Sequence, residues 1–584
     1  MTDEKQNRFP AVFWTANVTE LFERAAYYSM ASFVVIYLGQ LGLGAYWPSN
    51  LNSVLWTLVY FLPILSGTIA DQVGFRKSLL VAFVLLAAGY MLMGSPVWFG
   101  GAKLAPVVAK EFTASPTLVA TIVAGILLIG IGGSVIKPCI SGTVQKTAGT
   151  LATLGFAIFY MIINIGSLFG RGTAFVVRTR PDVVLILGVV LVCGAAAALL
   201  TLLVKWNVAH REERGTILKT TLGALAIIVG AGLGISQALR LRPAPELAAG
   251  SPALSYIFGV ATVASIVAFF VVLVFYKEPP VPADAPVKPK RSPGRILLDM
   301  VLVLKNPRFT LFLVVISGFF FLYNQVYNVM PLYVKRVVET SPAMDLYTAA
   351  NPFVIVCFQL LVTSLFGKMK PVRSMIVGCV IIGVSMGINL WPLWSADGLR
   401  APVADLLPIA SIFIILTVGL IAFGELYTSP RMYEYIGGLA PKGQEGLFLG
   451  YANLPLAIGS LTGGPVGAWI FNDVMAKGAT TRPDGLLELD RAAATRGWLL
   501  LMAIGFLSAV AMWAFNRWVE AQEAKERQQA SGGDRKSVSA SLRQPIAPNE
   551  HGKASEKSAA ATGASARNAL RVASVPGNRL SRVS

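Results

Sequence analysis

Three charged side chains lie close together near the start of the chain, within the stretch "TELFERAAYYSM". They are Glu20, Glu23 and Arg24, and largely apolar sequence follows them. Each residue of a helix turns by about 100°, so in a helix these charges share one face with Tyr27 and Ala31. Charged residues inside a membrane are rare, usually face the protein interior, and mark substrate or ion pathways. The spacing therefore predicts a buried charge network on one face of the first helix.

Lys137, in "GIGGSVIKPCISG", supplies the second basic group that this network needs for neutrality. Two glutamates, one arginine and one lysine carry no net charge when both acids are ionised. Protonation of one glutamate would leave the two bases in excess and free to hold an anion. We therefore expect the network to couple a proton to a substrate carboxylate; a purely structural ion network is the alternative.

A second embedded acid, Glu425, lies in "FGELYTSPRMYEYIGGLAP". The apolar residues before it and the helix-breaking Pro430 after it place it inside the C-terminal half of the chain. It has no basic neighbour close in sequence, so its carboxylate is expected to be protonated or to await a cation. The alternative is an acid at the end of a span, where its side chain reaches water.

The elements that must position these groups are long apolar segments. The 584 residues are 55% hydrophobic and only 14% charged, with a mean hydropathy of +0.64. A soluble domain is about one quarter charged, and a membrane-spanning helix needs roughly 20 apolar residues. The sequence therefore predicts an all-α polytopic membrane protein. Fourteen apolar spans are expected, at 13–41, 50–70, 78–99, 116–140, 150–172, 182–204, 218–239, 253–276, 309–334, 348–367, 373–394, 404–428, 447–472 and 496–518.

The order of these spans predicts two six-helix bundles with two inserted transmembrane helices between them. The inserted pair, 218–239 and 253–276, carries no embedded charge and is expected to face lipid. Two halves that rock around a site at the membrane midplane resemble the major facilitator architecture. The expected divisions are a cytoplasmic N-terminus (1–12), an N-terminal bundle (13–204), cytoplasmic linkers with the inserted helices (205–308), a C-terminal bundle (309–519) and a disordered basic cytoplasmic tail (520–584).

Lysine and arginine are concentrated in alternate loops, as expected for loops on the cytoplasmic side of a membrane. With fourteen spans, both termini would be cytoplasmic in a multi-pass cell membrane protein, such as one of the bacterial inner membrane. The charged residues in the first span do not fit a cleavable signal peptide. The net charge of +19 is explained by the loops and the tail, so no nucleic-acid partner is predicted.

Few residues fit catalysis or metal binding. The four cysteines, Cys139, Cys193, Cys357 and Cys379, lie in or at the ends of apolar spans without the spacing of metal ligands. Both histidines lie in polar segments, so any proton carrier is expected to be a carboxylate. The glycines of "GIGG" suit close helix packing better than phosphate binding. The sequence predicts neither an enzyme nor a metal or other cofactor, and a proton gradient is the expected source of energy.

The segment "GTIADQVGFRK" joins the second and third spans and resembles the major facilitator loop pattern G-x3-D-x2-G-x-R-[KR]. Gly67 permits close helix approach, and Asp71 can cap a helix or pair at its end. Arg76 and Lys77 would lie on the cytoplasmic side. Together with Gly74, these residues are expected to have a conformational role and not to bind substrate.

Four motifs follow one another along the chain. The first is Glu20-x-x-Glu23-Arg24-x-x-Tyr27-Tyr28, and the others are "IKPCISG", "FYMIINIGSL" and "GELYTSP". The first is similar to the E-x-x-E-R-F-x-Y-Y motif of the proton-dependent oligopeptide transporter (POT/PTR) family of the major facilitator superfamily. "FYMIINIGSL" is similar to the F-Y-x-x-I-N-x-G-[SA]-L signature of that family, and the other two resemble its fourth- and tenth-helix segments.

This resemblance implies a role for the residues that match the family. The residues that would couple protons are Glu20, Glu23, Arg24, Lys137 and Glu425. The residues that would bind the substrate are Arg24, Tyr27, Tyr28, Tyr60, Lys137, Asn164, Asn324, Gln325, Glu425 and Tyr451. Arg24 and Lys137 would bind a peptide carboxylate, and Asn164 and Glu425 would receive its amino group. For Asn164, a hydrogen bond between helices is the alternative.

The chain departs from the family pattern at four positions. Ala25 replaces the motif phenylalanine, and Ala31 stands where many peptide-transporting members have a second arginine. Asn324 occupies the place of a frequent glutamate, and Tyr451 the place of a common tryptophan. These changes keep the proton-coupling network but remove one base from the expected carboxylate site and the gating acid from the C-terminal half.

The motifs together predict a monomeric proton-coupled symporter that imports di- and tripeptides by alternating access. Because of the departures, proton-coupled or facilitative transport of another small organic solute or anion is the alternative. A transport-dead sensor or scaffold is a further alternative, and the costly embedded charges argue against it. The expected partners are a short peptide, protons and the lipid bilayer.

Overall fold

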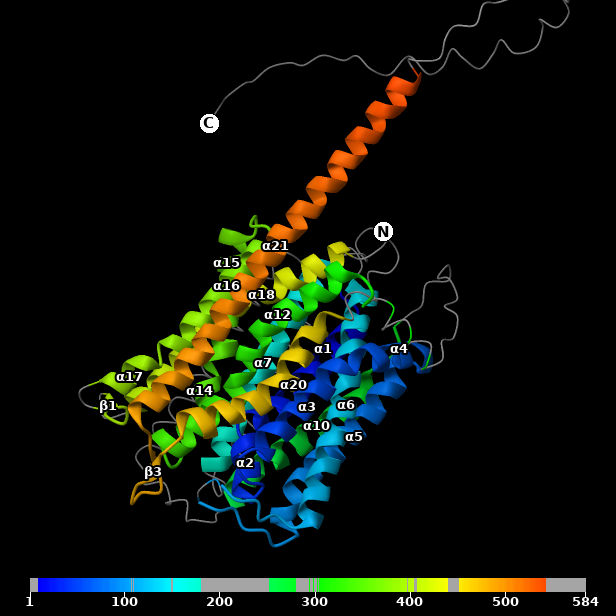
Figure 1. Cartoon of the computed structure of the whole chain (residues 1–584). Coiled ribbons are helices and arrows are strands. Elements are labelled where there is room, and N and C mark those ends of the chain that lie inside the picture. The colour runs from blue at the N-terminus through cyan, green and yellow to red at the C-terminus, as the bar shows by residue number, and fades with distance from the viewer. Residues whose placement is uncertain are drawn as a thin grey trace, which may run out of the picture. The chain divides into compact units, whose positions relative to one another are not determined.

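The computed structural model divides into two units, residues 1–520 and 521–584. The residues that it describes are 9–106, 108, 110–148, 151–179, 252–279, 294, 298, 302, 304–395, 398–403, 407–439 and 451–541. The first unit is built almost entirely of helices (Figure 1). The predicted spans at 182–204 and 218–239 lie outside the described residues.

The N-terminal half of the first unit is a helical bundle. Its elements are α1 (Ala11–Ala31), α2 (Val34–Gln40), α3 (Trp47–Phe61), α4 (Pro63–Val73), α5 (Phe75–Trp98), α6 (Pro116–Ala148), α7 (Ala152–Thr179), η3 (Pro252–Ser255) and α10 (Tyr256–Phe275). The axes of α3 and α4 differ by 45°. Pro63 explains this bend, because proline has no N–H group with which to continue the preceding helix.

The C-terminal half is also helical, with short pieces of other structure between its spans. Its helices are α12 (Pro307–Asn324), η4 (Gln325–Tyr327), α13 (Val329–Tyr333), η5 (Val334–Val338), α14 (Met344–Thr348), α15 (Ala350–Phe366), α16 (Pro371–Gly387), α17 (Leu390–Trp394), α18 (Ile409–Leu439), η6 (Tyr451–Asn453), α20 (Leu454–Trp469), η7 (Ile470–Met475) and α21 (Arg491–Ser541). Two antiparallel pairs of strands lie in its loops: β1 (Pro402–Val403) with β2 (Leu407–Pro408), and β3 (Thr480–Thr481) with β4 (Leu487–Glu488).

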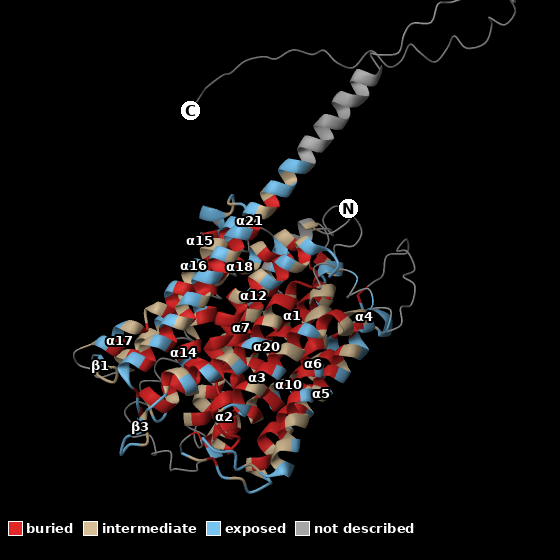
Figure 2. Ribbon diagram, viewed as in Figure 1, coloured by how far each residue is buried: buried red, intermediate tan, exposed pale blue. Residues whose placement is uncertain are grey.

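In the described part of the chain, nine helical segments are long and apolar enough to cross a membrane, and the bent α3–α4 pair makes ten. α1 is not among them because its charged residues lower its hydropathy. Buried residues concentrate in the middle of the bundle, along α1 and its neighbours, and exposed residues on the outer helices (Figure 2). The all-α polytopic class is therefore confirmed, while the total of fourteen spans stays a prediction.

α1 and α7 pack closely along a line of small residues. A methyl group at Gly166 would lie 2.6 Å from the carbonyl oxygen of Leu21, and one at Gly170 would overlap the carbonyl oxygen of Ala25. Small residues four positions apart let membrane helices approach one another closely. Ala25, where the family motif has phenylalanine, is part of this contact. The contact holds α7 against the helix that carries the charges.

α10 is packed on one side only. The segment 253–276 was predicted to be one of two inserted helices facing lipid; α10 packs against α1, α5 and α7 and exposes apolar side chains such as Val263 and Phe270. Ser29 on α1 donates a hydrogen bond to the carbonyl oxygen of Ile257 at 3.3 Å, and Trp98 at the end of α5 donates one to Ser255 at 2.8 Å. These contacts make α10 part of the N-terminal bundle. The absence of embedded charge, on which the prediction depended, does not indicate which helices such a segment packs against.

The two halves meet where α3 lies against α20. A methyl group at Gly464 would overlap the carbonyl oxygen of Ser49 and the hydroxyl group of Ser53. Asn52, also on α3, donates a hydrogen bond to the carbonyl oxygen of Tyr327 at 3.1 Å. Small side chains and one buried amide therefore join the halves at this contact.

The last helix is longer than predicted. α21 continues to Ser541, past the predicted start of a disordered tail at residue 520. The segment "VEAQEAKERQQA" explains this difference, because alanine, glutamate, glutamine, lysine and arginine all have high helix propensity. Residues 542–584, to which the rest of the prediction applies, lie outside the described part of the chain.

The α1–α7 contact predicts that Gly170→Ala lowers the unfolding temperature of the purified protein, because overpacking costs about 1–3 kcal/mol. Gly172→Ala, on the same helix, is the matched control, since a methyl group at Gly172 meets no atom within 4 Å. We expect the control to be neutral or slightly stabilising. Equal unfolding temperatures for the two variants would contradict this packing.

Candidate functional site

The three charges of α1 are all inside the protein. Glu20, Glu23 and Arg24 are at most 3% exposed. The guanidinium of Arg24 pairs with both carboxylates, at 3.4 Å from Glu20 and in a shorter contact with Glu23. Both oxygens of Glu20 and one of Glu23 accept no hydrogen bond. The sequence placed these groups on one face correctly, and in this arrangement one cation serves two buried acids.

Lys137, on α6, is near this group but is not bound to it. Its ammonium lies 5.9 Å from the centre of the Tyr60 ring, and among the described residues no carboxylate lies within ion-pair distance of it. It interacts electrostatically both with Glu20 on α1 and with Glu425 on α18. The predicted four-charge network is therefore a contact of three charges, with a half-buried lysine acting on acids in both halves.

Aromatic rings surround these cations. The guanidinium of Arg24 lies 5.5 Å from the centre of the Tyr27 ring, and the rings of Tyr27 and Tyr28 meet edge to face at 5.4 Å. The face of an aromatic ring attracts a cation within about 6 Å. The structure thus brings together Tyr27, Tyr28 and Tyr60, the three tyrosines predicted to line the pocket, with Arg24 and Lys137.

Trp56, on α3, joins these tyrosines to the C-terminal half and was missed in the sequence. Its ring centre lies 5.5 Å from Tyr27, 5.6 Å from Tyr60 and 4.6 Å from Tyr327. Tyr327 in turn lies 6.3 Å from Tyr323. Trp56 is four residues before Tyr60, one helical turn away, and that spacing is the signal that could have found it.

Glu425 is half-buried on α18 and faces polar neighbours. Asn351, on α15, donates a hydrogen bond to its carboxylate at 3.2 Å. Asn164 donates to the carbonyl oxygen of Tyr160, one turn back in its own helix, at 2.9 Å. Asn164 and Glu425 therefore come from opposite halves, and Asn351 is a partner that the sequence did not indicate.

Three residues predicted for the pocket lie elsewhere. Asn324 donates a hydrogen bond to Ser460 at 3.1 Å, and Gln325 donates one to the carbonyl oxygen of Gly463 at 3.2 Å. Both are fully buried between α12 and α20. Tyr451, at the start of that region, is also fully buried and packs edge to face against Phe309 at 5.7 Å. Among the described residues, the hydrogen bonds of Asn324 and Gln325 do not reach the tyrosines of α1 and α3, and these two amides fill the interface between two helices of one half.

The predicted conformational loop is a set of helix ends. A methyl group at Gly67 would lie 3.0 Å from the Pro138 side chain, so α4 passes close to α6. Gly74 ends α4 and begins α5 with a φ of +100°, a conformation that favours glycine. Asp71 lies 3.8 Å from Lys146 in an exposed ion pair. These contacts connect the α4–α5 turn with α6, the helix that carries Lys137.

Glu278, which follows α10, binds the start of α5. Its carboxylate accepts hydrogen bonds from the backbone N–H groups of Phe75 at 2.7 Å and Arg76 at 3.0 Å. A carboxylate is favourable there because the first N–H groups of a helix have no partner within the helix. The side chain of Arg76 donates to the carbonyl oxygen of Leu273 at 2.7 Å, while Lys77 is exposed.

Two buried arginines of α7 were also missed. Arg171 is fully buried and Arg178 is 6% exposed. Arg178 pairs with Asp345 on α14 at 3.3 Å, so it joins the two halves. The signal was available in "FGRGTAFVVR", where two basic residues interrupt an apolar span. They were overlooked because neither belongs to one of the recognised motifs.

In the part of the chain that the structure describes, no three His, Cys, Asp or Glu side chains lie together as metal ligands. Cys139 and Cys379 are buried, and Cys357 is exposed. The polar groups that the bundle gathers at its centre are instead acids, bases and tyrosines from both halves. A helical bundle with such a centre fits the major facilitator architecture predicted from the sequence.

Comparisons with known proteins show which family the chain resembles. The model of the Major Facilitator Superfamily matches residues 173–424, and that of the POT family matches residues 63–233. Each match covers less than half of the chain, which is thus similar to the POT family of the major facilitator superfamily.

The chain is similar to curated peptide transporters. It is 33% identical over 172 residues to Peptide transporter family 1 of Drosophila melanogaster, a match that covers 28% of this chain and 21% of that protein. It is 23% identical over 490 residues to Dipeptide and tripeptide permease A of Escherichia coli (strain K12), covering 78% of this chain and 84% of the permease. The chain thus matches about a fifth of the length of the fly relative and most of the length of the bacterial one.

Solved structures share the fold. An auto-inhibited POT family peptide transporter matches with a TM-score of 0.57 and 16% identity, covering 87% of this chain and 97% of that one. A POT family transporter in complex with 5-aminolevulinic acid matches with a TM-score of 0.52 and 18% identity, covering 87% and 96%. These likenesses bear out the predicted major facilitator fold.

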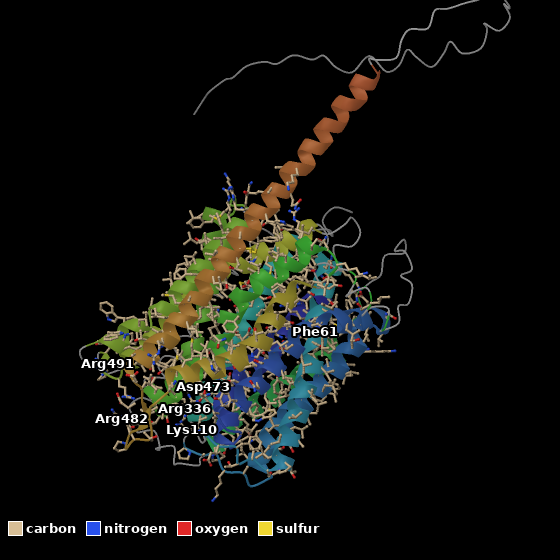
Figure 3. All side chains as sticks on the ribbon, viewed as in Figure 1. Phe61, Lys110, Arg336, Asp473, Arg482 and Arg491 are labelled. Atoms are coloured by element: carbon tan, nitrogen blue, oxygen red, sulfur yellow. The ribbon has the colours of Figure 1, made fainter. Side chains whose placement is uncertain are left out.

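The α1 charges predict a large loss of stability in Arg24→Ala, because the variant leaves two buried carboxylates without their cation, at a cost of about 3–5 kcal/mol. Arg482→Ala is the matched control. Arg482 also pairs with two acids, Asp484 at 3.2 Å and Glu488 at 3.3 Å, but in an exposed loop that lies at the edge of the molecule (Figure 3). We expect a lower unfolding temperature for Arg24→Ala only. Similar unfolding temperatures in both variants would show that the α1 group is not a buried charge cluster.

Proposed function

We propose that this protein is a proton-coupled symporter that imports di- and tripeptides by alternating access. The observation that carries the proposal is the pairing of Arg24 with both Glu20 and Glu23, beside a lysine that acts on Glu20 and on Glu425. A buried group with two acids and one base changes its affinity for an anion when one acid takes a proton. The cation that the acid releases is then available to a substrate.

The proton would bind at Glu20 or Glu23. Either carboxylate, once it is protonated and neutral, attracts the guanidinium of Arg24 less strongly. The guanidinium and Lys137 would then attract the carboxylate of a peptide, and loss of the proton would weaken that attraction. Proton and peptide would thus bind and leave together, which is the requirement for symport.

The other end of the peptide would meet Glu425. Its carboxylate can receive a positively charged amino group, with Asn351 keeping it in place through a hydrogen bond, and Asn164 on α7 would be the partner from the other half. Tyr27, Tyr28 and Tyr60 would line the space between the two ends. A ligand with charges of both signs would therefore contact both halves at once, and this favours their closing around it.

A second candidate function is transport of another small organic anion or amino-acid-like solute. Two observations favour it. Ala31 supplies no second base on α1, and Asn324 is bound to Ser460 within its own half. A POT family structure with the same fold holds 5-aminolevulinic acid, which also has an amino group and a carboxylate but no peptide bond. Charges at both ends of the ligand are common to the two candidates.

The remaining parts of the proposal concern the whole protein. The multi-pass protein would lie in a bacterial inner membrane with both termini in the cytoplasm, as the basic loops indicate. It would act as a monomer, with protons, peptide and lipid as its partners and without a cofactor. The α4–α5 turn, with Gly67, Asp71 and Arg76, would change conformation on the cytoplasmic side.

Coupling predicts that proteoliposomes containing the protein accumulate alanyl-alanine when an inward proton gradient and an inside-negative potential are imposed. Glu23→Gln should abolish this accumulation while exchange of labelled for unlabelled peptide continues, because exchange needs no net proton movement. Wild-type vesicles that take up no member of a peptide panel would refute the peptide assignment. Unchanged accumulation in Glu23→Gln would refute the coupling role.

The role of Glu425 predicts that Glu425→Gln weakens binding of alanyl-alanine by about 10- to 100-fold, since a hydrogen bond to a charged group contributes about 1.5–3 kcal/mol. N-acetyl-alanyl-alanine, which lacks the amino group, should bind wild type and variant equally. Glu434→Gln is the control, because Glu434 lies on the same helix and pairs with Arg431 at the surface. Equal affinity of wild type for the free and the blocked peptide would contradict this role.

A further inference from the structure

Arg171 is a buried cation that the proton-coupling scheme does not use. Its side chain is fully enclosed, and its guanidinium lies 4.4 Å from the centre of the Tyr28 ring. Tyr28 is one of the tyrosines that surround Arg24. Arg171 therefore lies beside the group of tyrosines and reaches it from α7, whereas the other basic groups come from α1 and α6.

In the part of the chain that the structure describes, the hydrogen-bond partners of this guanidinium are neutral. Its Nε donates to the hydroxyl group of Thr348 at 2.9 Å, and one Nη donates to that of Tyr327 at 3.0 Å. The other Nη donates to Ser167. In the described ranges, no carboxylate lies within 4 Å of Arg171, in contrast to Arg178 on the same helix, which pairs with Asp345. A buried charge without a partner of opposite sign is costly, so this arrangement favours an incoming anion.

The neutral partners belong to different halves. Ser167 and Tyr28 are in the N-terminal half, and Tyr327 and Thr348 are in the C-terminal half. The hydroxyl groups of Tyr327 and Thr348 hold Arg171 across the boundary between the halves. When the halves separate at this point, Arg171 would lose both hydroxyl groups and keep its charge.

The position also agrees with the missing base on α1. Ala31 stands where many peptide-transporting relatives have a second arginine, and its neighbour Ser32 bonds to Thr348 at 2.7 Å. The same Thr348 oxygen accepts from Arg171. The guanidinium of Arg171 thus lies beside the segment of α1 from which that arginine is absent. The glycines of α7 make this possible, because they bring the helix against α1.

We infer that Arg171 binds the carboxylate of the substrate and that this carboxylate replaces the hydroxyl groups of Tyr327 and Thr348. The inference rests on the proposed function and names one more residue for the carboxylate end of its pocket. Arginine suits the role because its planar guanidinium can form two parallel hydrogen bonds with a carboxylate. In this structure the two hydroxyl groups occupy those donors, so Arg171 is also a contact between the halves that the substrate would release.

The test compares ligands that differ in one charged group. Dissociation constants are measured for alanyl-alanine and for alanyl-alanine amide, which lacks the carboxylate, from the thermal stability of the full-length protein in nanodiscs. Wild type should bind alanyl-alanine more tightly than alanyl-alanine amide. Arg171→Gln should lower the affinity for alanyl-alanine by about 10- to 100-fold and leave the affinity for the amide unchanged. Arg171→Lys keeps the charge and should retain part of the preference. Unchanged affinity of Arg171→Gln for alanyl-alanine would overturn the inference.

Arg178→Gln is the matched control, since it removes a buried arginine of the same helix whose partner is Asp345. It is expected to lower stability but to keep the preference for the free carboxylate. If Arg171→Gln lowers the affinity for alanyl-alanine and for its amide by the same factor, the role of Arg171 is structural and the inference fails.

N-acetyl-alanine separates this inference from the proposed function. If wild type binds it but neither peptide, and Arg171→Gln loses that binding, peptide transport is refuted while Arg171 remains the anion-binding group. If wild type binds none of the three ligands, both proposals fail. If Tyr327→Phe, which removes one competing hydroxyl group, lowers the affinity for alanyl-alanine, the exchange of partners is refuted.

Discussion

The rest of the structure depends on one constraint, which is that Arg24 must neutralise two carboxylates away from water. Such a group is stable only where the surrounding helices exclude water and supply the remaining interactions. α1 therefore lies inside the N-terminal bundle, against α7 and α10, and its small residues allow that contact. The same burial makes the group sensitive to a single proton, because neutralising one of the two carboxylates away from water changes the net charge of the group and its attraction for Arg24.

The polar centre of the protein is divided between its halves, and in the proposed function this division would couple binding to transport. Arg24, Lys137 and Arg171 come from the N-terminal half, and Glu425 comes from the C-terminal half. Tyr327, from the C-terminal half, accepts a hydrogen bond from Arg171 at 3.0 Å. A ligand with charges of both signs would bridge the halves, whereas in its absence hydroxyl groups and the Arg178–Asp345 ion pair hold them together. Small differences between these two sets of contacts can decide which side is open.

Much of this was visible in the sequence, where charge interrupts apolar runs. Glu20, Glu23 and Arg24 could be placed on one face from helical periodicity alone, and Gly74 could be assigned to a loop because its segment resembles the major facilitator pattern. The packing of α10 and the burial of Asn324 between two helices could not be predicted, because they depend on which distant helices are neighbours. Arg171 could have been noticed as an embedded charge, but only the fold reveals that its partners are neutral and belong to both halves.

The central claim is that peptide and proton cross together through the α1 charges. Its most direct test traps a pH-sensitive dye inside proteoliposomes with equal pH on both sides and an inside-negative potential. Addition of alanyl-alanine should acidify the interior at a rate that follows the entry of labelled peptide. Entry of the peptide with no change in internal pH would contradict the account.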